Sequence, residues 1–391
     1  MIKRERIVML YAVILIVLLA LTGCGGSLQD IADINSDTRT DIISDEELQP
    51  DVQESETAWQ TGEHDERYVY MTLDEECQRV YTEIYATIIN HEEAREVSTL
   101  DPDVLDEAYR AVMSDYGELF WFSGYVYTQY KKGDVIEALE FAPSYTKTAD
   151  ERSAIQEQID GRVSEILADI SPDASDYDKT RYVFDYLAAN VDYVLGSQDN
   201  QNIISVFLYG QTVCQGYASA TQYLLSKLGI QSAIVTGEAE GNAHAWNLVR
   251  MDGEYYYVDT TWGNSTYTGE EMGNERFINY NYFGITTDEL LATHLPDDAF
   301  ALPECTATRD NYYMREECYF STWEPDTIGA LCKAGYESGN TAVSVKFATE
   351  EIYQQTKQYF IEEQHILDYC SGITTLYYVE DVQQKVLIFR F

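Results

Sequence analysis

A two-residue turn constrains the fold of this chain more than any other feature, because it sets the register of two strands. Asp252-Gly253 separates two runs in which apolar and polar residues alternate, 243–251 and 254–261. Asp-Gly between alternating runs is a strong signal for a two-residue β-hairpin. We therefore expect an antiparallel pair of strands, preceded by a third strand over 230–238.

This register brings an imidazole and a carboxylate together. It places Trp246 opposite Asp259 and His244 opposite Thr261, and side chains alternate between the two faces of a strand. His244 and Asp259 then lie on one face as diagonal neighbours, within reach of a hydrogen bond. The sequence therefore predicts a general base with a carboxylate that orients it and stabilises its protonated form.

A cysteine upstream of the hairpin supplies a nucleophile for this pair. Cys214 opens a predicted helix that ends at Gly229, and the positive end of the helix dipole favours the reactive thiolate. Gly216 is expected to let a substrate approach the backbone. A thiol nucleophile needs a base, and the base needs a third group to orient it. We therefore predict Cys214 as nucleophile, His244 as general base and acid, and Asp259 as orienter.

The rest of the predicted cleft is less sharply defined. The backbone N–H of Cys214 is one expected oxyanion donor, and Tyr209 and Gln211 are the candidates for a second one. Gln215 and Trp246 are further candidates for contacting the substrate. The sequence alone does not identify which of these side chains faces the thiol.

His294 is a rival candidate for the base. It lies beyond the hairpin, in an Ala-Thr-His-Leu segment without strand register, so we interpret it as a loop residue. Trp262 is as consistent with core packing as with the cleft. Taken alone, Cys214 would more often be a buried small hydrophobic residue. The catalytic interpretation therefore depends on the histidine and the aspartate of the hairpin being in register.

Three runs of this segment resemble the core of the transglutaminase-like superfamily. They are 213–218 (VCQGYA), 244–247 (HAWN) and 258–262 (VDTTW), in this order within about 175–295. The resemblance implies a papain-like α+β fold, in which a helix carries the cysteine and an antiparallel sheet carries the histidine and the aspartate. It also implies a Cys-His-Asp triad made of the three residues already singled out. The resemblance indicates the type of reaction better than the substrate.

The first 66 residues predict export and anchoring. Three basic residues precede an apolar run over 7–21, which is shorter than the ~20 residues of a spanning helix and typical of a signal peptide. The run ends in Leu-Thr-Gly-Cys, which resembles the bacterial lipobox. We therefore predict a signal peptide over 1–23 and lipidation of Cys24 at the outer face of the bacterial cell membrane. An uncleaved signal anchor and an ordinary secretory signal are the alternatives. Residues 24–66 are acidic and poor in aromatic residues, which predicts a disordered tether.

The remaining chain divides into three predicted units. Residues 67–174 are expected to form a mostly helical region with a hairpin, and residues 175–304 the transglutaminase-like core. Residues 305–391 predict a small α/β unit with a hairpin near 305–320, and the sequence attaches no chemistry to it.

Charge and cysteine usage exclude several classes of function. With 25 Lys and Arg against 68 Asp and Glu, the formal net charge is −43, which argues against nucleic-acid binding and against electrostatic docking on anionic lipid. The cysteines form no CxxC pair and have no histidine at zinc spacing, so neither a metal nor an organic cofactor is expected. The sequence leaves open whether Cys305 and Cys318 pair across the predicted hairpin.

The sequence therefore predicts a surface-anchored thiol acyl-transfer enzyme. The favoured substrates are amide bonds of cell-envelope or extracellular peptides and proteins, including the cell wall, and hydrolysis is the favoured outcome. A transglutaminase that joins glutamine to amines is one alternative. The other is a non-catalytic binding or scaffold module on the same fold, which uses surfaces rich in the 33 tyrosines of the chain.

Overall fold

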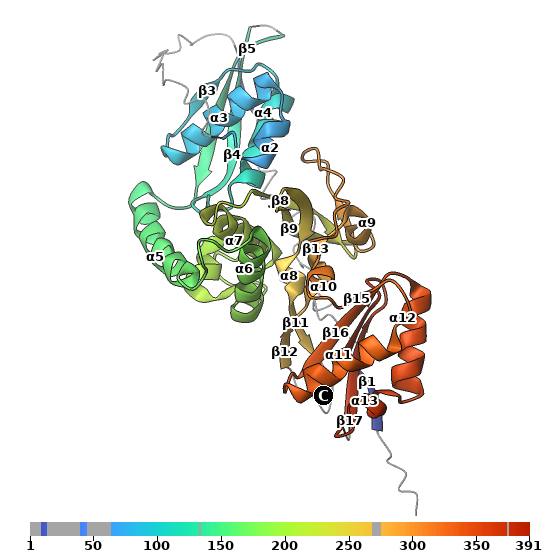
Figure 1. Ribbon diagram of the computed structural model, residues 1–391. Coiled ribbons are helices and arrows are strands. Elements are labelled where there is room, and N and C mark those ends of the chain that lie inside the picture. The colour runs from blue at the N-terminus through green and yellow to red at the C-terminus, as the bar shows by residue number, and fades with distance from the viewer. Residues whose placement is uncertain (1–8, 14–39, 45–63, 133, 268–274, 374) are drawn as a thin grey trace, which may run out of the picture.

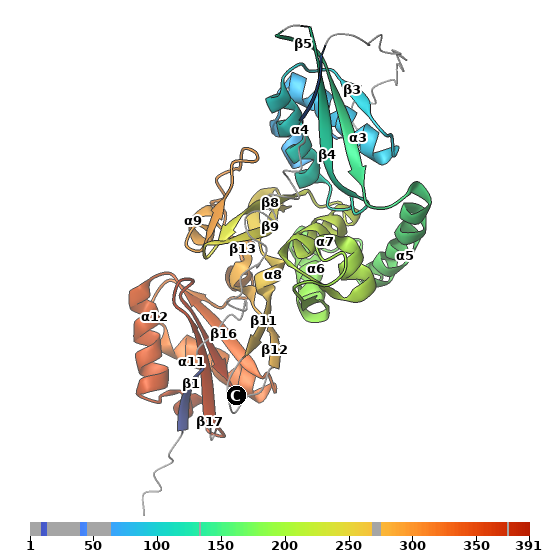
Figure 2. The ribbon, with the colours of Figure 1, turned by 180° about the vertical axis from the view of Figure 1, so that it is seen from behind.

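The molecule is an α+β arrangement of three units that follow one another along one axis (Figure 1). A unit of helices and a hairpin lies at one end, a helix-and-sheet unit lies in the middle, and an α/β unit lies at the other end (Figures 1 and 2). The predicted fold class is confirmed. The computed structural model describes residues 9–13, 40–44, 64–132, 134–267, 275–373 and 375–391.

The N-terminal unit packs two helices on a sheet built around the predicted hairpin (Figure 2). Apolar residues at helical spacing, such as Val80, Ile84 and Val112, form its core. The Nδ1 atom of His64 lies 2.7 Å from the hydroxyl oxygen of Tyr116, so packing contacts begin inside the predicted tether. The elements are α2 (Tyr68–Thr72), α3 (Glu75–Ile89), β3 (Arg95–Val97), α4 (Pro102–Asp115), β4 (Phe122–Lys132) and β5 (Val135–Tyr145).

Two short strands lie within the predicted leader and tether. β1 (Met9–Val13) pairs in parallel with β17 (Thr375–Asp381), and β2 (Thr40–Ser44) pairs in parallel with β4. β2 departs from the disorder predicted for the acidic tether; it contains two adjacent isoleucines, which favour strands. Cys24 lies outside the described residues, as does most of both segments, so lipidation stays a prediction. Within the described part of the chain, no helix is long and apolar enough to cross a membrane.

A group of helices connects the N-terminal unit to the central sheet. α5 begins with a capping box between Thr148 and Glu151, and the Ser175 hydroxyl caps α6. α7 ends as predicted, because Gly229 follows its last turn with a φ of 75°. The elements are α5 (Ala149–Leu167), α6 (Asp176–Asn190), β6 (Asp192–Tyr193), the π-helix η1 (Ser205–Tyr209), β7 (Gln211–Thr212) and α7 (Cys214–Lys227).

The central sheet contains the predicted hairpin in the predicted register. Its strand order is β13-β10-β9-β8-β14, and Met251 pairs with Glu254 across the turn. The second strand is shorter than predicted, because the chain leaves the strand after Val258 to begin a short helix. The elements are β8 (Ser232–Ala239), β9 (Asn242–Met251), β10 (Glu254–Val258), α8 (Thr260–Gly263), β11 (Asn264–Tyr267), β12 (Glu275–Ile278), the 3-10 helix η2 (Tyr280–Tyr282), β13 (Phe283–Ile285), α9 (Thr287–Leu290) and β14 (His294–Pro296).

The C-terminal unit packs helices against a second five-stranded sheet, in the order β1-β17-β18-β16-β15. Its hydrophobic core is separate from the core shared by the other two units, and Tyr312 packs against both. Besides β1 and β17, its elements are α10 (Tyr312–Arg315), β15 (Tyr319–Phe320), α11 (Pro325–Glu337), β16 (Ala342–Phe347), α12 (Glu350–Lys357), the π-helix η3 (Gln358–Glu362), α13 (Ile366–Tyr369) and β18 (Val386–Arg390).

The prediction of a hairpin near 305–320 is wrong. The segment contains α10 and the two-residue strand β15, which pairs with the distant strand β16. Cys305 belongs to the core of the first two units and Cys318 to the core of the C-terminal unit. Both are free thiols, and burial raises the pKa of each to about 12. The disulfide considered for this segment is therefore not formed.

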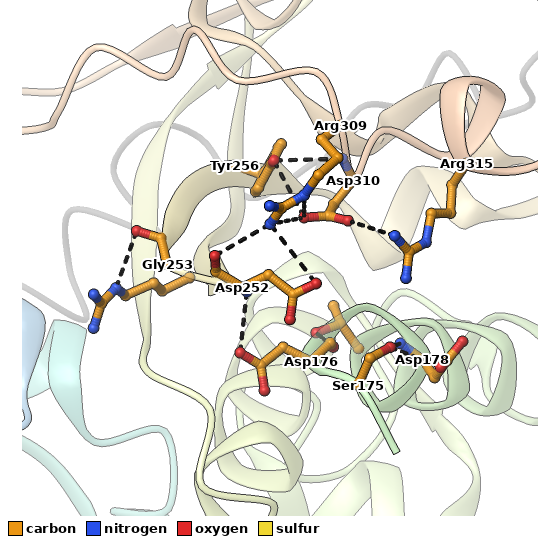
Figure 3. A network of polar contacts seen from close by, with 11 residues as sticks. Ser175, Asp176, Asp178, Asp252, Gly253, Tyr256, Arg309, Asp310 and Arg315 are labelled. Atoms are coloured by element: carbon orange, nitrogen blue, oxygen red, sulfur yellow. Dashed lines mark hydrogen bonds and ion pairs between the residues drawn. The ribbon is translucent and has the colours of Figure 1, made fainter. Parts of the chain in front are cut away.

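A polar network holds the turn of the central hairpin (Figure 3). Nη2 of Arg309 donates to a carboxylate oxygen of Asp310 at 2.9 Å and to the backbone oxygen of Asp252 at 3.1 Å. The Tyr256 hydroxyl also donates to Asp310, at 3.3 Å. On the other side of the turn, the N–H of Asp252 donates to Asp176 at the start of α6, at 3.0 Å. The turn that sets the register is thereby fixed from both sides.

Candidate active site

Helix α7 holds Cys214 at its first position, where the side chain is buried. The amide of Asn247 on β9 donates to the backbone oxygen of Ala218 at 3.0 Å, which fixes the helix against the sheet. The hydroxyl oxygens of Thr221 and Thr260 lie 2.8 Å apart and join α7 to α8. No side chain caps the start of α7, so the positive end of the helix dipole acts on the thiol.

The imidazole of His244 and the carboxylate of Asp259 form a buried hydrogen bond. Nε2 of His244 lies 2.8 Å from Oδ2 of Asp259, and the two side chains are 3% and 1% exposed. Because Nε2 is bound to the carboxylate, Nδ1 is the nitrogen that can take a proton from a nucleophile. The structure thus brings together the two side chains that the sequence placed side by side.

Asp259 reaches this position from a backbone conformation that the sequence did not predict. It does not lie in the strand opposite Trp246, because it is the N-cap residue of α8. Its Oδ1 accepts from the N–H of Trp262 at 3.1 Å, and its own N–H donates to the carbonyl of Tyr282 at 3.0 Å. One carboxylate oxygen therefore caps a helix, and the other is directed at the histidine.

The charge state of Asp259 is decided by its neighbours. Burial alone would raise the pKa of this carboxyl, but the hydrogen bonds from His244 and His294, and the positive charge of either ring when it is protonated, lower the pKa well below its usual range. A carboxylate that stays ionised can stabilise the imidazolium that forms when the base takes up a proton. Asp259 therefore fits the role of an orienter that is never protonated itself.

A second histidine shares this carboxylate, so the interpretation of His294 as a loop residue was wrong. His294 is the first residue of β14, opposite Ala239 on β8, and its side chain is fully buried. Its Nε2 lies 3.2 Å from Oδ2 of Asp259. No pattern in the sequence predicts this contact, because β14 has three residues and no tight turn fixes its pairing with β8.

Aromatic rings enclose the two histidines. The ring centroid of Trp246 lies 4.9 Å from that of His294 and 6.0 Å from that of His244. The rings of Trp262 and Tyr282 lie 4.7 and 5.4 Å from that of His294. Trp246 is 1% exposed, so it packs against the two histidines, and its contact with a substrate stays a prediction.

The other predicted cleft residues differ in their surroundings. Tyr209 is 47% exposed at the end of η1, and Gln211 is half-buried in β7. Gln215 lies in the first turn of α7, where its amide nitrogen is 3.4 Å from the hydroxyl of Ser219. Their roles in binding an oxyanion or a substrate stay predictions.

Gly216 has a packing role, and its predicted proximity to a substrate stays a prediction. A Cβ at this position would lie 1.9 Å from Oγ1 of Thr212 and 3.1 Å from the backbone oxygen of Asn200. The Thr212 hydroxyl is itself fixed, because it donates to Asn200 at 2.7 Å and accepts from Ser205 at 2.9 Å. Glycine therefore lets the first turn of α7 press against the loop before it.

Within the described part of the chain, the side chains of His244, Asp259 and His294 also form a group of metal-ligand type, with ligand atoms within 4.8 Å of one another. Both Nε2 atoms, however, are hydrogen-bonded to the same carboxylate oxygen. An ionised carboxylate only accepts hydrogen bonds, so both nitrogens carry protons and present no lone pair to a metal ion. The geometry favours a shared carboxylate over a metal centre.

A helix that begins with a thiol, packed against a strand that carries an imidazole with a buried carboxylate partner, contains the groups that thiol acyl transfer requires. Residues 164–260 match the family model of the Transglutaminase-like superfamily, so this segment of the chain is similar to that superfamily. This range contains Cys214, His244 and Asp259 but not His294.

Two curated relatives are the kyphoscoliosis peptidases of Mus musculus and Homo sapiens. The mouse protein is 24% identical over 165 residues, which cover 37% of this chain and 25% of the relative. The human protein is 24% identical over 156 residues, which cover 35% and 23%. The chain thus spans about a quarter of the length of these relatives. The alignment with a crystal structure of a TGase covers 39% of this chain and 52% of that chain, with 14% identity and a TM-score of 0.26.

Proposed function

We propose that the protein is a thiol-dependent acyl-transfer enzyme that acts on amide bonds. The observation that carries the proposal is the buried 2.8 Å hydrogen bond between Asp259 and His244, which lies on the strand packed against the helix that begins at Cys214. A base, an orienting carboxylate and a thiol at the positive end of a helix are the groups that a thioester mechanism requires.

The proposed reaction uses each of these groups in turn. Nδ1 of His244 takes the proton of the Cys214 thiol, and Sγ attacks the carbonyl carbon of an amide. The backbone N–H of Cys214 donates to the oxyanion. The imidazolium gives its proton to the leaving amine, the C–N bond breaks, and a thioester is left. Water then attacks the thioester, with His244 as base, and releases the acid and the thiol, while Asp259 stays ionised throughout.

Hydrolysis of envelope or extracellular peptides and proteins is the activity we propose, with the protein anchored at the outer face of the membrane through a lipid on Cys24. The signal-peptide pattern over 1–23 supports export. The names of the two curated relatives, both called peptidases, support hydrolysis over transamidation. The net charge of −43 supports a peptide substrate over a nucleic acid.

The reactivity of Cys214 tests whether the site is an enzyme. Alkylation by iodoacetamide is followed across pH by peptide mass spectrometry on the full chain, and the other five described cysteines, all buried free thiols, serve as internal controls. The rate at Cys214 should stay high well below the free thiol pKa of ~8.5. A Cys214 that reacts only near that pKa, or not at all, contradicts the proposal and supports a non-catalytic binding module.

Product analysis separates the two possible acyl acceptors. Cys214→Ala should abolish cleavage of envelope peptides, and retained cleavage of the same peptide contradicts the triad. Incorporation of dansylcadaverine into a glutamine donor identifies a transglutaminase, because an amine then resolves the thioester in place of water. Cleavage without incorporation supports the hydrolase.

A further inference from the structure

We propose that His294 is a positioning residue of this site: a neutral second imidazole that donates to Asp259 and shares the charge of that carboxylate with the base, His244. Its catalytic meaning rests on the proposed function, but its effect on the base can be measured without a substrate. The inference goes beyond the triad, because His294 lies outside both the sequence motifs and the matched range 164–260.

Three donors converge on the Asp259 carboxylate. The N–H of Trp262 donates to Oδ1 at 3.1 Å, and both imidazoles are hydrogen-bonded to Oδ2, His244 at 2.8 Å and His294 at 3.2 Å. A carboxylate oxygen can accept two hydrogen bonds. Two donors on one oxygen draw on the same negative charge, so the bond from His294 reduces the stabilisation that Asp259 gives to the protonated form of His244.

Thr293 fixes the proton of His294 on the nitrogen that faces the carboxylate. Oγ1 of Thr293 lies 2.8 Å from Nδ1 of His294. Because an ionised carboxylate only accepts, Nε2 carries the proton, and in the neutral ring Nδ1 accepts from the threonine hydroxyl. Both ring nitrogens of the neutral His294 are thereby hydrogen-bonded in one tautomer.

The surroundings of His294 favour its neutral form. The titratable groups that face it are Asp259 before α8, His244 on β9, Glu240 between β8 and β9, and Tyr282 on η2. Burial lowers the pKa of His294 and outweighs Asp259 and Glu240, which raise it, while His244 lowers it further. A neutral His294 places no second cation beside the imidazolium that forms during the reaction.

The sheet has room for this second imidazole on the face used by the first. On β8, Gly237 lies opposite His244, and Ala239 lies opposite His294. These small residues leave space between the two rings. A Cβ at Gly237 would lie 2.2 Å from the backbone oxygen of Leu295, so glycine lets β14 approach β8 closely enough for its histidine to reach the carboxylate.

The test measures the pKa of His244 by NMR titration of the full chain labelled at its histidine rings. The chain has five histidines, so single substitutions assign the signals. In His294→Leu, Asp259 acts on His244 alone, and the pKa of His244 should rise by about half to one unit. His294→Gln retains an N–H donor and should return the pKa of His244 most of the way to the wild-type value.

Two further variants separate this role from packing. Thr293→Val removes the hydroxyl that contacts Nδ1 and holds the His294 ring in place, so the hydrogen bond from His294 to Asp259 should weaken and the pKa of His244 should rise. This variant carries the test should His294→Leu fail to fold. His365→Gln is the matched control: His365 lies in the C-terminal unit, hydrogen-bonded to Asp368, and should leave the pKa of His244 unchanged. If the pKa of His244 is the same in the wild type, in His294→Leu and in Thr293→Val, the proposal is overturned. Stoichiometric Zn²⁺ binding that requires His294 also overturns it, because the group would then be a metal centre.

The alkylation profile of Cys214 distinguishes this proposal from the proposed function. In a working enzyme, the basic limb of the profile should move to higher pH in His294→Leu by the same amount as the pKa of His244. An inert Cys214 together with a responsive His244 contradicts the proposed function alone. A reactive Cys214 together with an unresponsive His244 contradicts the positioning role alone.

Discussion

Replacing Lys346 tests whether the C-terminal unit supports the active site. Its side chain on β16 is 3% exposed, and Nζ lies 2.6 Å from a carboxylate oxygen of Glu289 on α9 and 3.2 Å from the amide oxygen of Gln384. Glu289 also completes the capping box of α9 with Thr286. The ion pair therefore joins the C-terminal unit to the short helix that precedes His294.

The expected cost follows from the burial of the two charges. Lys346→Met keeps most of the aliphatic volume but leaves Glu289 without its counter-charge, at a site where the Glu289 side chain is 28% exposed. Breaking a fully buried pair costs about 3–5 kcal/mol of unfolding free energy, and the partial exposure of Glu289 reduces the expected loss to about 2–3 kcal/mol. In Lys346→Met/Glu289→Gln no charge is left and the glutamine oxygen can still cap α9, so the loss should fall to about 1 kcal/mol.

The effect should depend on pH in a defined direction. Burial raises the pKa of Glu289, but Lys346 and Thr286 together lower it below its usual value. A carboxyl whose pKa is lowered on folding contributes stability above its unfolded pKa of about 4.3, and that stability is lost as the pH falls through the folded pKa. The difference between wild type and Lys346→Met should therefore be full at pH 7 and should shrink in acid.

Urea denaturation followed by circular dichroism and tryptophan fluorescence measures this loss. Lys333→Met is the matched control, because Lys333 is 51% exposed and its pair with Glu337 spans 3.8 Å, so it should change the unfolding free energy by less than about 0.5 kcal/mol. A loss below about 1 kcal/mol for Lys346→Met refutes the argument from a buried charge pair. A double variant as unstable as the single one refutes it as well.

Three further predictions concern the site and the buried thiols. Asp259→Asn should lower kcat about 10²–10⁴-fold, because the base loses the anion that orients it; steady-state rates check this, and activity near wild type contradicts the orienting role. Gly216→Ala should lower the unfolding free energy by about 1–3 kcal/mol, because the methyl group overlaps a fixed hydroxyl; an unchanged urea midpoint contradicts the steric argument. Cys305 and Cys318 should resist a disulfide reagent in the folded protein at pH 8, because burial raises their pKa to about 12; modification faster than unfolding contradicts their burial.

The central hairpin could be predicted because its information is local. The Asp252-Gly253 turn and the alternating residues beside it decide the register without any distant contact. The prediction that α7 starts at Cys214 also depended only on neighbouring residues in the sequence. These two features were enough to place the thiol, the imidazole and the carboxylate in one part of the molecule.

The features that the sequence missed depend on distant contacts or on the end of a strand. Asp259 was expected within β10, but the chain turns there to use its carboxylate as a helix cap. His294 enters the site through a three-residue strand that pairs with β8, more than 50 residues earlier in the chain. Gly216 was assigned to the substrate because the sequence does not show that Thr212 lies against it.

One contact of the C-terminal unit reaches the segment that holds Asp259. Nδ2 of Asn281 donates to a carboxylate oxygen of Asp381 at 2.7 Å, and Oδ1 of Asn281 accepts from the hydroxyl of Tyr313 at 2.6 Å. The next residue, Tyr282, offers the carbonyl that accepts the N–H of Asp259. The C-terminal unit thereby fixes the backbone to which Asp259 is hydrogen-bonded.

A second contact reaches the segment that leads to His294. Nε2 of Gln384 donates to the backbone oxygen of Glu289 at 3.1 Å, next to the ion pair with Lys346. Both segments that complete the site beyond the hairpin are thus held by residues 313–384. No motif marks this role, because it consists of single polar contacts between residues far apart in sequence. The C-terminal unit therefore supports the candidate site at its carboxylate, Asp259, and at its second histidine, His294.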